Sequence, residues 1–354
     1  MNDDSTPAQS RLEDLPAYLL ERLTPQMRDV LEHQFEDEAR RRAEVTLPED
    51  PTEASRAEYR AERAFWNEGG PTMASTRELQ IHAAGIDVPV RIHLPVTVDA
   101  AGSASGSGSA AGSGKVPAIL FFHGGGFTLG DLDTHDRIHR MIAHHSGAAV
   151  VAVDYSLSPE VKFPQALREC AGVTAHVAEH GEELGLDGSR LAFAGDSAGS
   201  GLSIGAALLL RDEAPDVFAR LQALVLIYGG FGLKDSAARR LWGGWWDGMK
   251  MDDLSGFQEA LYADPADADS SYVQTLRSDL SGLPPVFMRS AELDPLADDT
   301  AAFAQMLRRA GHTPDVREVP GVLHSYLHFG RLLDEANFTL TEGAQFIAAR
   351  FAQG

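Results

Sequence analysis

Cysteine and positive charge are both scarce in this chain of 354 residues. Cys170 is the single cysteine, which excludes an internal disulfide framework and a cysteine-rich metal site. Its apolar neighbours indicate a buried packing residue. The 30 lysines and arginines stand against 52 aspartates and glutamates, a formal net charge of −22. Because such a chain repels phosphate backbones and anionic lipid surfaces, we expect no nucleic-acid partner and no membrane partner.

Long apolar runs and cofactor signatures are also missing. No stretch reaches the roughly 18 apolar residues that a membrane span needs, and the N-terminal M-N-D-D lacks the basic and apolar regions of a targeting signal. No H-E-x-x-H pattern or paired histidine ligand set occurs, and no Walker lysine follows the glycine run at 124–126. We therefore expect a cytoplasmic protein without a metal ion or a cofactor.

The N-terminal part of the chain has the pattern of helices followed by a strand pair. Apolar residues recur at three- and four-residue spacing over residues 12–66, which predicts at least two amphipathic helices. Alternation and β-branched residues over 77–94 predict a hairpin that opens a sheet. Residues 100–114 are only Ala, Gly and Ser. Because this composition cannot bury apolar area, we expect a flexible surface loop there.

From residue 118 onward, strands and helices alternate. Strands are predicted at 118–122, 148–154, 190–194, 223–227, 285–289 and 315–319, and helices at 134–145, 163–179 and 202–210. This alternation predicts an α/β fold with a mainly parallel sheet flanked by helices, and ligand sites in such sheets lie at the carboxyl ends of the strands. Residues 229–272 interrupt the alternation, and we assign them, together with the helical residues 1–75, to a helical cap over a catalytic domain at 76–354.

The sequence G-D-S-A-G at 195–199 is the most informative motif. It joins the apolar strand at 190–194 to the helix that follows, and this strand, sharp turn and helix are typical of a nucleophile elbow. Small residues two positions either side of Ser197 avoid backbone collisions in so tight a turn. The following helix would direct its N–H groups and dipole at a developing oxyanion. The alternative is an ordinary glycine-rich turn.

A nucleophilic serine needs a general base, and the base needs a carboxylate that fixes its tautomer. Asp294 lies in the loop just beyond the strand at 285–289, which makes it the candidate acid. Asp298 and Asp299 compete with it. These two open a predicted helix, where carboxylates commonly serve the N-terminal cap and the helix dipole, so we prefer Asp294.

His324 is the candidate base. It closes the loop expected at 320–324, after the last predicted strand and in the order serine, acid, histidine that an elbow fold requires. His312 precedes that strand and His328 lies one helical turn past His324. We interpret both as loop or helix-surface histidines.

The H-G-G-G sequence at 123–126 directly follows the strand at 118–122. An oxyanion hole needs backbone N–H groups in a loop where no Cβ obstructs the substrate. The predicted donors are therefore the N–H groups of Gly124 and Gly125, together with that of Ala198 from the elbow. His123 is expected to orient the loop, which continues through Gly126. A phosphate cradle is the other interpretation of such a glycine run.

With H-G-G-G, G-D-S-A-G, D-P-L at 294–296 and His324 in this order, the chain resembles the hormone-sensitive-lipase-like family of α/β-hydrolases. The D-Y-S-L-S-P-E segment at 154–160 is similar to a segment of that family, and the sequences at 130–137, 246–248 and 323–328 are most similar to its bacterial acetyl esterases. The resemblance implies an α/β-hydrolase fold with a helical cap and a cytoplasmic serine carboxylesterase that cleaves short-chain, above all acetyl, esters.

Several alternatives stay open at this point. The same catalytic residues suit a broader lipase or an amide-cleaving hydrolase, and the same fold can carry a ligand-binding or regulatory module. A homo-oligomer and a regulatory protein partner are further possibilities. Trp242, Trp245 and Trp246 would either narrow the pocket against long acyl chains or simply pack the cap onto the core. The triad residues do not indicate the alcohol part of the substrate, because their chemistry involves only the acyl carbon and its oxygens.

Overall fold

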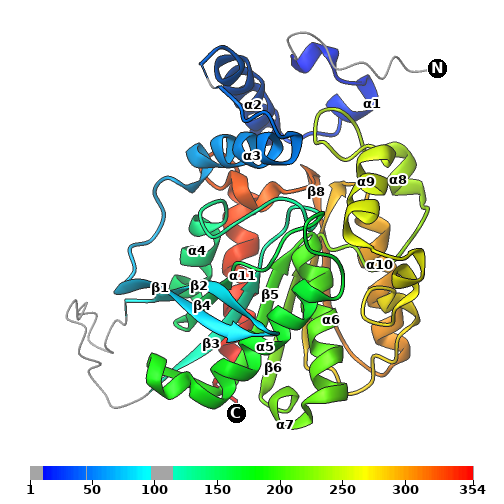
Figure 1. The fold of residues 1–354 in the computed structure, drawn as a ribbon. Helices are drawn as coiled ribbons and strands as arrows, with labels where there is room; N and C mark the ends of the chain where they lie inside the picture. The colour runs from blue at the N-terminus through cyan, green and yellow to red at the C-terminus, as the bar shows by residue number, and fades with distance from the viewer. Residues whose placement is uncertain (1–10, 45, 97–114, 354) are drawn as a thin grey trace.

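The computed structural model describes residues 11–44, 46–96 and 115–353 (Figure 1). Its centre is an eight-stranded sheet in the order β1-β2-β4-β3-β5-β6-β7-β8. The first two strands form an antiparallel hairpin, and β2 pairs antiparallel with β4. All other neighbours run parallel. The predicted α/β fold with a mainly parallel sheet is thus confirmed. The predicted loop at 100–114 lies outside the described residues.

The strands are β1 (Ser75–Ala83), β2 (Ile86–Leu94), β3 (Val116–Phe122), β4 (Ala149–Val153), β5 (Leu186–Asp196), β6 (Leu221–Ile227), β7 (Val286–Leu293) and β8 (Asp315–Leu323). The longer helices are α2 (Pro25–Glu44), α3 (Pro51–Asn67), α4 (Asp136–Ser146), α5 (Gln165–His180), α6 (Ala198–Glu213), α9 (Met251–Leu261), α10 (Ala297–Arg309) and α11 (Asp334–Phe351). Within the described residues, no helix has the length and apolar character needed to cross a membrane.

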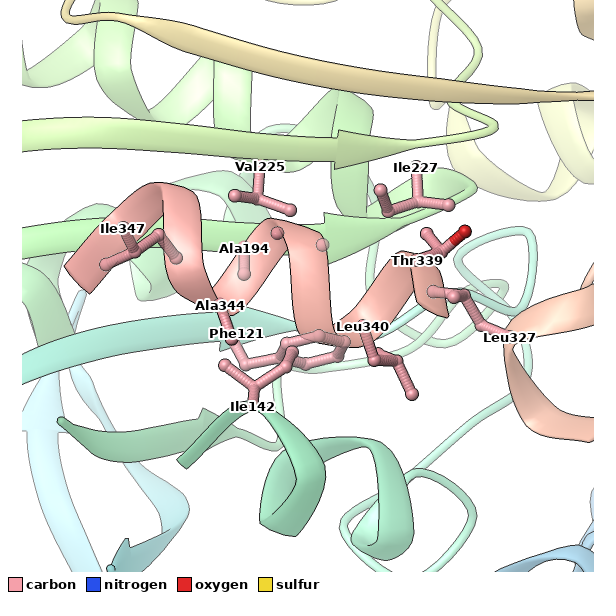
Figure 2. Close-up of a pocket in the computed structure, with 12 residues that line it drawn as sticks. Phe121, Ile142, Ala194, Val225, Ile227, Leu327, Thr339, Leu340, Ala344 and Ile347 are labelled. Atoms are coloured by element: carbon pink, nitrogen blue, oxygen red, sulfur yellow. The ribbon is translucent and has the colours of Figure 1, made fainter. Parts of the chain in front are cut away.

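Helices cover both faces of the sheet, because its central strands are apolar on both sides. Every residue of β4 is buried, as expected for such a strand. One apolar cluster joins the sheet to α5, α6 and α10, and Cys170 is buried within it. The other joins the opposite face to α4 and α11. Figure 2 shows that second interior, where Leu340, Ala344 and Ile347 of α11 face the strands around a void of only about 10 Å³.

The helical N-terminal region and the segment between β6 and β7 both approach the carboxyl ends of the strands. Figure 1 shows α2 and α3 above the sheet, with α8 (Ala237–Leu241) and α9 beside them. Residues of α2, α3 and α9 line one pocket together with the start of α6. Asp50 caps the start of α3 by accepting the N–H groups of Thr52 and Glu53 at 3.0 Å, which satisfies donors that a helix leaves open at its N-terminus.

The last strand is longer than the sequence pattern predicts. A loop was expected at 320–324, but β8 continues to Leu323, and His324 follows it directly. The register between β7 and β8 shifts between Ala291 and Leu293, an irregularity that accommodates the extra strand residues. Because β8 is the edge strand of the sheet, Pro320 can lie within it without removing a hydrogen bond that a central strand would need.

Buried histidines gather between α4 and the sheet. His139 packs edge-on against Phe121 with ring centroids 4.6 Å apart, and neither of its ring nitrogens has a hydrogen-bond partner. Burial holds the pKa of His139 well below its ordinary value, because the charged imidazolium would lose its hydration. The folded protein therefore keeps this side chain neutral at a pH where the unfolded chain already binds the proton.

We expect a His139→Met variant to resist acid better than the wild type. An unfolded histidine becomes protonated below about pH 6.5, so stability is fully present above that pH and is lost as the pH falls below it. Between about pH 7.5 and pH 5 the variant should gain roughly 2 kcal/mol relative to the wild type. Denaturant unfolding at the two pH values measures the gain. An identical pH dependence of both proteins would contradict this prediction.

Candidate active site

Ser197 occupies the sharp turn between β5 and α6. Its backbone has φ 50° and ψ −119°, a conformation that side-chain-bearing residues rarely adopt and that costs about 1–3 kcal/mol. The Ser197 N–H donates to the Ile227 carbonyl at 2.9 Å, which holds the turn in place. A Cβ on Gly195 would lie 2.5 Å from the backbone of Gly199. Only small residues therefore fit around this serine, as a nucleophile elbow requires.

The structure brings the three predicted catalytic side chains together. The Nε2 of His324 lies 2.9 Å from the Oγ of Ser197, and its Nδ1 lies 2.8 Å from Oδ2 of Asp294. The other carboxylate oxygen of Asp294 accepts the Leu296 N–H at 2.7 Å. Ser197, Asp294 and His324 are all buried. They come from the carboxyl ends of β5, β7 and β8, three strands on one side of the sheet.

The electrostatic surroundings suit His324 as a proton acceptor. Burial alone would lower the pKa of His324, but the adjacent Asp294 carboxylate opposes this effect through its charge and its hydrogen bond, and the pKa is raised overall. A raised pKa means that the imidazolium formed after proton abstraction is stabilised. The geometry and the charge thus allow the ring to take a proton from the serine hydroxyl.

The competing carboxylates have a different task from the one the sequence pattern predicts. Instead of serving only the start of α10, Asp299 Oδ1 accepts the N–H groups of residues 231–233 at 2.9–3.2 Å, and its Oδ2 binds the Arg239 guanidinium at 2.9 Å. Asp298 Oδ2 accepts the Ala238 N–H at 2.9 Å. Both side chains therefore fix the chain that leads into α8.

The two competing histidines also lie away from the reacting serine. His312 places its Nε2 2.7 Å from the Leu280 carbonyl. His328 is buried rather than on a helix surface, which corrects the prediction, and burial holds its pKa well below the ordinary value. Its ring lies edge-on to that of His135 at 4.5 Å. Neither histidine is hydrogen-bonded to Ser197.

The glycine loop corrects one predicted oxyanion donor. The N–H of Gly124 donates to Oδ1 of the buried Asp196 at 2.9 Å, so it is already engaged. Gly125 and Gly126 line the same pocket as Ser197 and Ala198, whereas Gly124 does not. In the described part of the chain, the N–H groups of Gly125 and Gly126 meet no protein acceptor. Gly126 was quoted within the motif but not assigned as a donor.

Asp196 and His123 brace this loop from behind. Burial would raise the pKa of Asp196, but His135 and the Gly124 N–H lower it overall, so the side chain is a carboxylate that can only accept hydrogen bonds. His123 stacks on Tyr155 with ring centroids 4.2 Å apart, and the Tyr155 hydroxyl donates to the His123 carbonyl at 2.7 Å. Burial lowers the pKa of His123 to about 4. A neutral, packed ring suits the predicted orienting role.

Ser197 opens into a pocket of about 430 Å³. Its lining includes Trp246 and Asp247 near His324, and residues of α3 and α9 on the outer side. Trp242 and Trp245 do not line this pocket. Their rings instead lie near those of Tyr18 and Phe35 in the N-terminal helices, with centroids 6.0 and 5.7 Å apart, so these two side chains have a packing role.

Asp247 is a pocket residue that sequence reasoning did not single out as functional. Its Oδ1 accepts the N–H groups of Gly244 and Met249 at 3.1 and 3.0 Å, while its Oδ2 has no hydrogen-bond partner. Burial raises the pKa of Asp247 to about 7. No spacing rule distinguishes this aspartate from the many others in so acidic a chain, because its position depends on how the segment between β6 and β7 folds back.

One group of side chains has the composition of a metal site. His135, Asp196 and His328 are buried, and their ligand atoms lie within 4.8 Å of one another. No histidine spacing in the sequence predicts this group, because its members come from the start of α4, the end of β5 and the turn after β8. Both oxygens of Asp196 are already occupied, Oδ1 by the Gly124 N–H and Oδ2 by the Tyr228 hydroxyl at 3.2 Å. The group therefore serves as polar support behind the elbow.

Comparison with known proteins agrees with this geometry. The family described as alpha/beta hydrolase fold matches residues 119–328, more than half of the chain. An esterase from Pyrobaculum calidifontis is 28% identical, with a TM-score of 0.78 over 92% of this chain and 98% of its own. EstE1, a carboxylesterase from a metagenomic library, is 27% identical, with a TM-score of 0.76 over 85% and 98%.

A thermostable esterase from Pseudomonas putida is 25% identical, with a TM-score of 0.77 over 93% of this chain and 98% of its own. These similarities extend over nearly the whole of each solved chain. Together with the family match, they confirm the resemblance that the ordered motifs indicated. The chain belongs to the alpha/beta hydrolase fold family, in its hormone-sensitive-lipase-like group.

Proposed function

We propose that this protein is a serine carboxylesterase that cleaves short-chain acyl esters, acetyl esters above all. One observation carries the proposal: the hydrogen-bonded series Ser197, His324 and Asp294 opens into the pocket that also contains the free N–H groups of the glycine loop. The similarity to the structures of an esterase and a carboxylesterase supports the reaction type, and the sequence resemblance supports the acetyl preference.

The geometry gives each group a role in the reaction. Ser197 Oγ attacks the ester carbonyl carbon while His324 Nε2 takes the hydroxyl proton, and the tetrahedral oxyanion lies against the N–H groups of Gly125, Gly126 and Ala198. His324 then protonates the leaving alkoxide, which departs as the alcohol. Water attacks the acyl-enzyme with the same proton relay, releasing the carboxylic acid and restoring Ser197.

We assign the helices above the sheet to a cap that shapes the substrate pocket. Tyr59 and Arg63 of α3 line this pocket together with Phe257 of α9. The cap segment is held to the catalytic core by Asp299, which binds residues 231–233 and Arg239. A site enclosed in this way excludes water and strengthens the electrostatic contacts to the reacting carbonyl.

Hydrolysis of p-nitrophenyl esters from acetyl to palmitoyl tests this proposal. We expect kcat/KM to be highest between the acetyl and butyryl esters, as the sequence resemblance to bacterial acetyl esterases implies. A maximum at the palmitoyl ester would instead indicate a lipase, and faster cleavage of aryl amides an amidase. A folded protein that hydrolyses none of these compounds would contradict the proposed enzyme and favour a binding role.

A further inference from the structure

A second, smaller cavity lies beside the catalytic pocket. Its volume is about 50 Å³, and apart from a tyrosine its lining is apolar or glycine. Six residues line this cavity alone, namely Phe163, Ala166, Leu167, Gly201, Leu202 and Tyr272. Leu202 and Gly201 belong to the first turns of α6, the helix that begins directly after Ser197. The cavity therefore adjoins the helix that follows Ser197 but lies outside the catalytic pocket.

Four residues line both cavities and form the wall between them: Phe127, Gly230, Leu261 and Val273. Phe127 directly follows the glycine loop, has φ 65°, and its carbonyl accepts the Ser158 N–H at 2.9 Å. Leu261 ends α9 and is only 5% exposed. Its backbone is held as well, since its carbonyl accepts the Phe163 N–H at 2.9 Å. Its side chain, however, is unbranched at Cβ and can change rotamer.

The residues around the two cavities distinguish the acyl side of the ester from the alcohol side. The leaving alcohol must lie against His324, because that ring protonates it. His324, Trp246 and Asp247 line the catalytic pocket but not the small cavity. The small cavity instead adjoins the glycine loop through Phe127 and the start of α6 through Gly201. It therefore extends from the acyl side of the reacting carbonyl.

We infer that the small cavity is a closed extension of the acyl-binding site and that Leu261 is the side chain that closes it. The ligand of this cavity is the apolar tail of a medium-length acyl chain. This inference rests on the proposed esterase function. About 10–15 Å³ of such space holds one water-sized group, so the cavity has room for roughly four methylene groups. With Leu261 in the position seen here, an acyl chain bound in the catalytic pocket does not reach the small cavity.

A Leu261→Ala variant tests the inference. The quantity measured is the ratio of kcat/KM for the octanoyl ester to kcat/KM for the acetyl ester. We expect this ratio to be at least tenfold higher in the variant than in the wild type, because each methylene buried in an apolar site strengthens binding about fourfold. The ratio is measured within one protein sample, so it does not depend on how much of the variant is folded.

Two further variants serve as controls. Leu254 lies on the same helix and lines the catalytic pocket but not the small cavity. Leu254→Ala should therefore leave the ratio within about threefold of the wild type, which is less than the effect of one buried methylene. Ala166 is buried and lines only the small cavity. Adding Ala166→Leu to Leu261→Ala should refill the space and return the ratio toward the wild-type value.

The outcomes separate this inference from the proposed function. An unchanged ratio in Leu261→Ala, or an equal rise in Leu254→Ala, would overturn the assignment of the small cavity while leaving the esterase intact. Loss of the raised ratio on refilling with Ala166→Leu would support it. A wild-type protein that fails to cleave even the acetyl ester would instead overturn the function on which the inference depends.

Discussion

Replacing Ser197 by alanine is expected to lower kcat for a p-nitrophenyl acetate assay by a factor of about 10⁶. In the proposed mechanism the hydroxyl oxygen forms the acyl bond, and this hydroxyl is the only group hydrogen-bonded to Nε2 of His324 among the described residues. The remaining N–H donors of the glycine loop can still polarise a bound ester, so a residual rate above the uncatalysed reaction is expected. Single-turnover kinetics should show no burst of nitrophenol.

Ser203→Ala is the matched control for this substitution. Ser203 is buried in the same helix, and its hydroxyl donates to the Gly199 carbonyl within that helix at 2.8 Å. Loss of such a bond leaves the catalytic hydroxyl in place, so kcat should stay within a few-fold of the wild type. A Ser197→Ala protein that retains even one-hundredth of the wild-type rate would contradict the assigned nucleophile, because another group would then carry the reaction.

Asp294→Asn is expected to lower kcat by a factor of about 10⁴. The amide matches the carboxylate in size, but its NH₂ group can donate to His324 Nδ1 and so favour the tautomer whose Nε2 carries the proton. That tautomer cannot accept the Ser197 proton. The substitution also removes the charge that raises the pKa of His324. The fall of kcat/KM on acidification, where His324 becomes protonated, should therefore move to lower pH.

Asp298→Asn is the control that separates the two aspartates. Its side chain accepts the Ala238 N–H, an interaction that the amide oxygen of asparagine can keep. We expect the rate and the acid limb of the pH profile to remain close to those of the wild type. If Asp298→Asn and Asp294→Asn lost similar activity, or if the acid limb moved in neither, the assignment of Asp294 as the partner of His324 would be wrong.

Much of the fold and site could be predicted because local sequence determines it. The alternation of apolar strands and helices indicated the sheet, and the small residues around Ser197 indicated the elbow whose φ of 50° the structure shows. Asp294 and His324 followed from their places at strand ends, since carboxyl ends of parallel strands meet at one edge. These predictions depend on chain order and on local packing limits.

The features that escaped prediction depend on tertiary contacts. Gly124 differs from its neighbours in the glycine run only because the carboxylate of Asp196 lies within reach of its N–H. The edge position of β8 decided how far that strand continues. Asp247 and Leu261 gain their positions from the folding of the segment between β6 and β7 over the sheet. No residue spacing encodes such contacts.

The order of the strands along the chain also sets when the proposed triad can first assemble. Ser197 and His324 are separated by 127 residues, and at ordinary rates of synthesis the histidine leaves the ribosome roughly 6 to 25 s after the serine. His324 directly follows β8, an edge strand of the sheet. This strand is held by Thr24, whose N–H donates to the Gly321 carbonyl at 3.0 Å. A nascent chain thus carries Ser197 before the proposed general base has been synthesised. The serine can be activated only after β8 has joined the sheet.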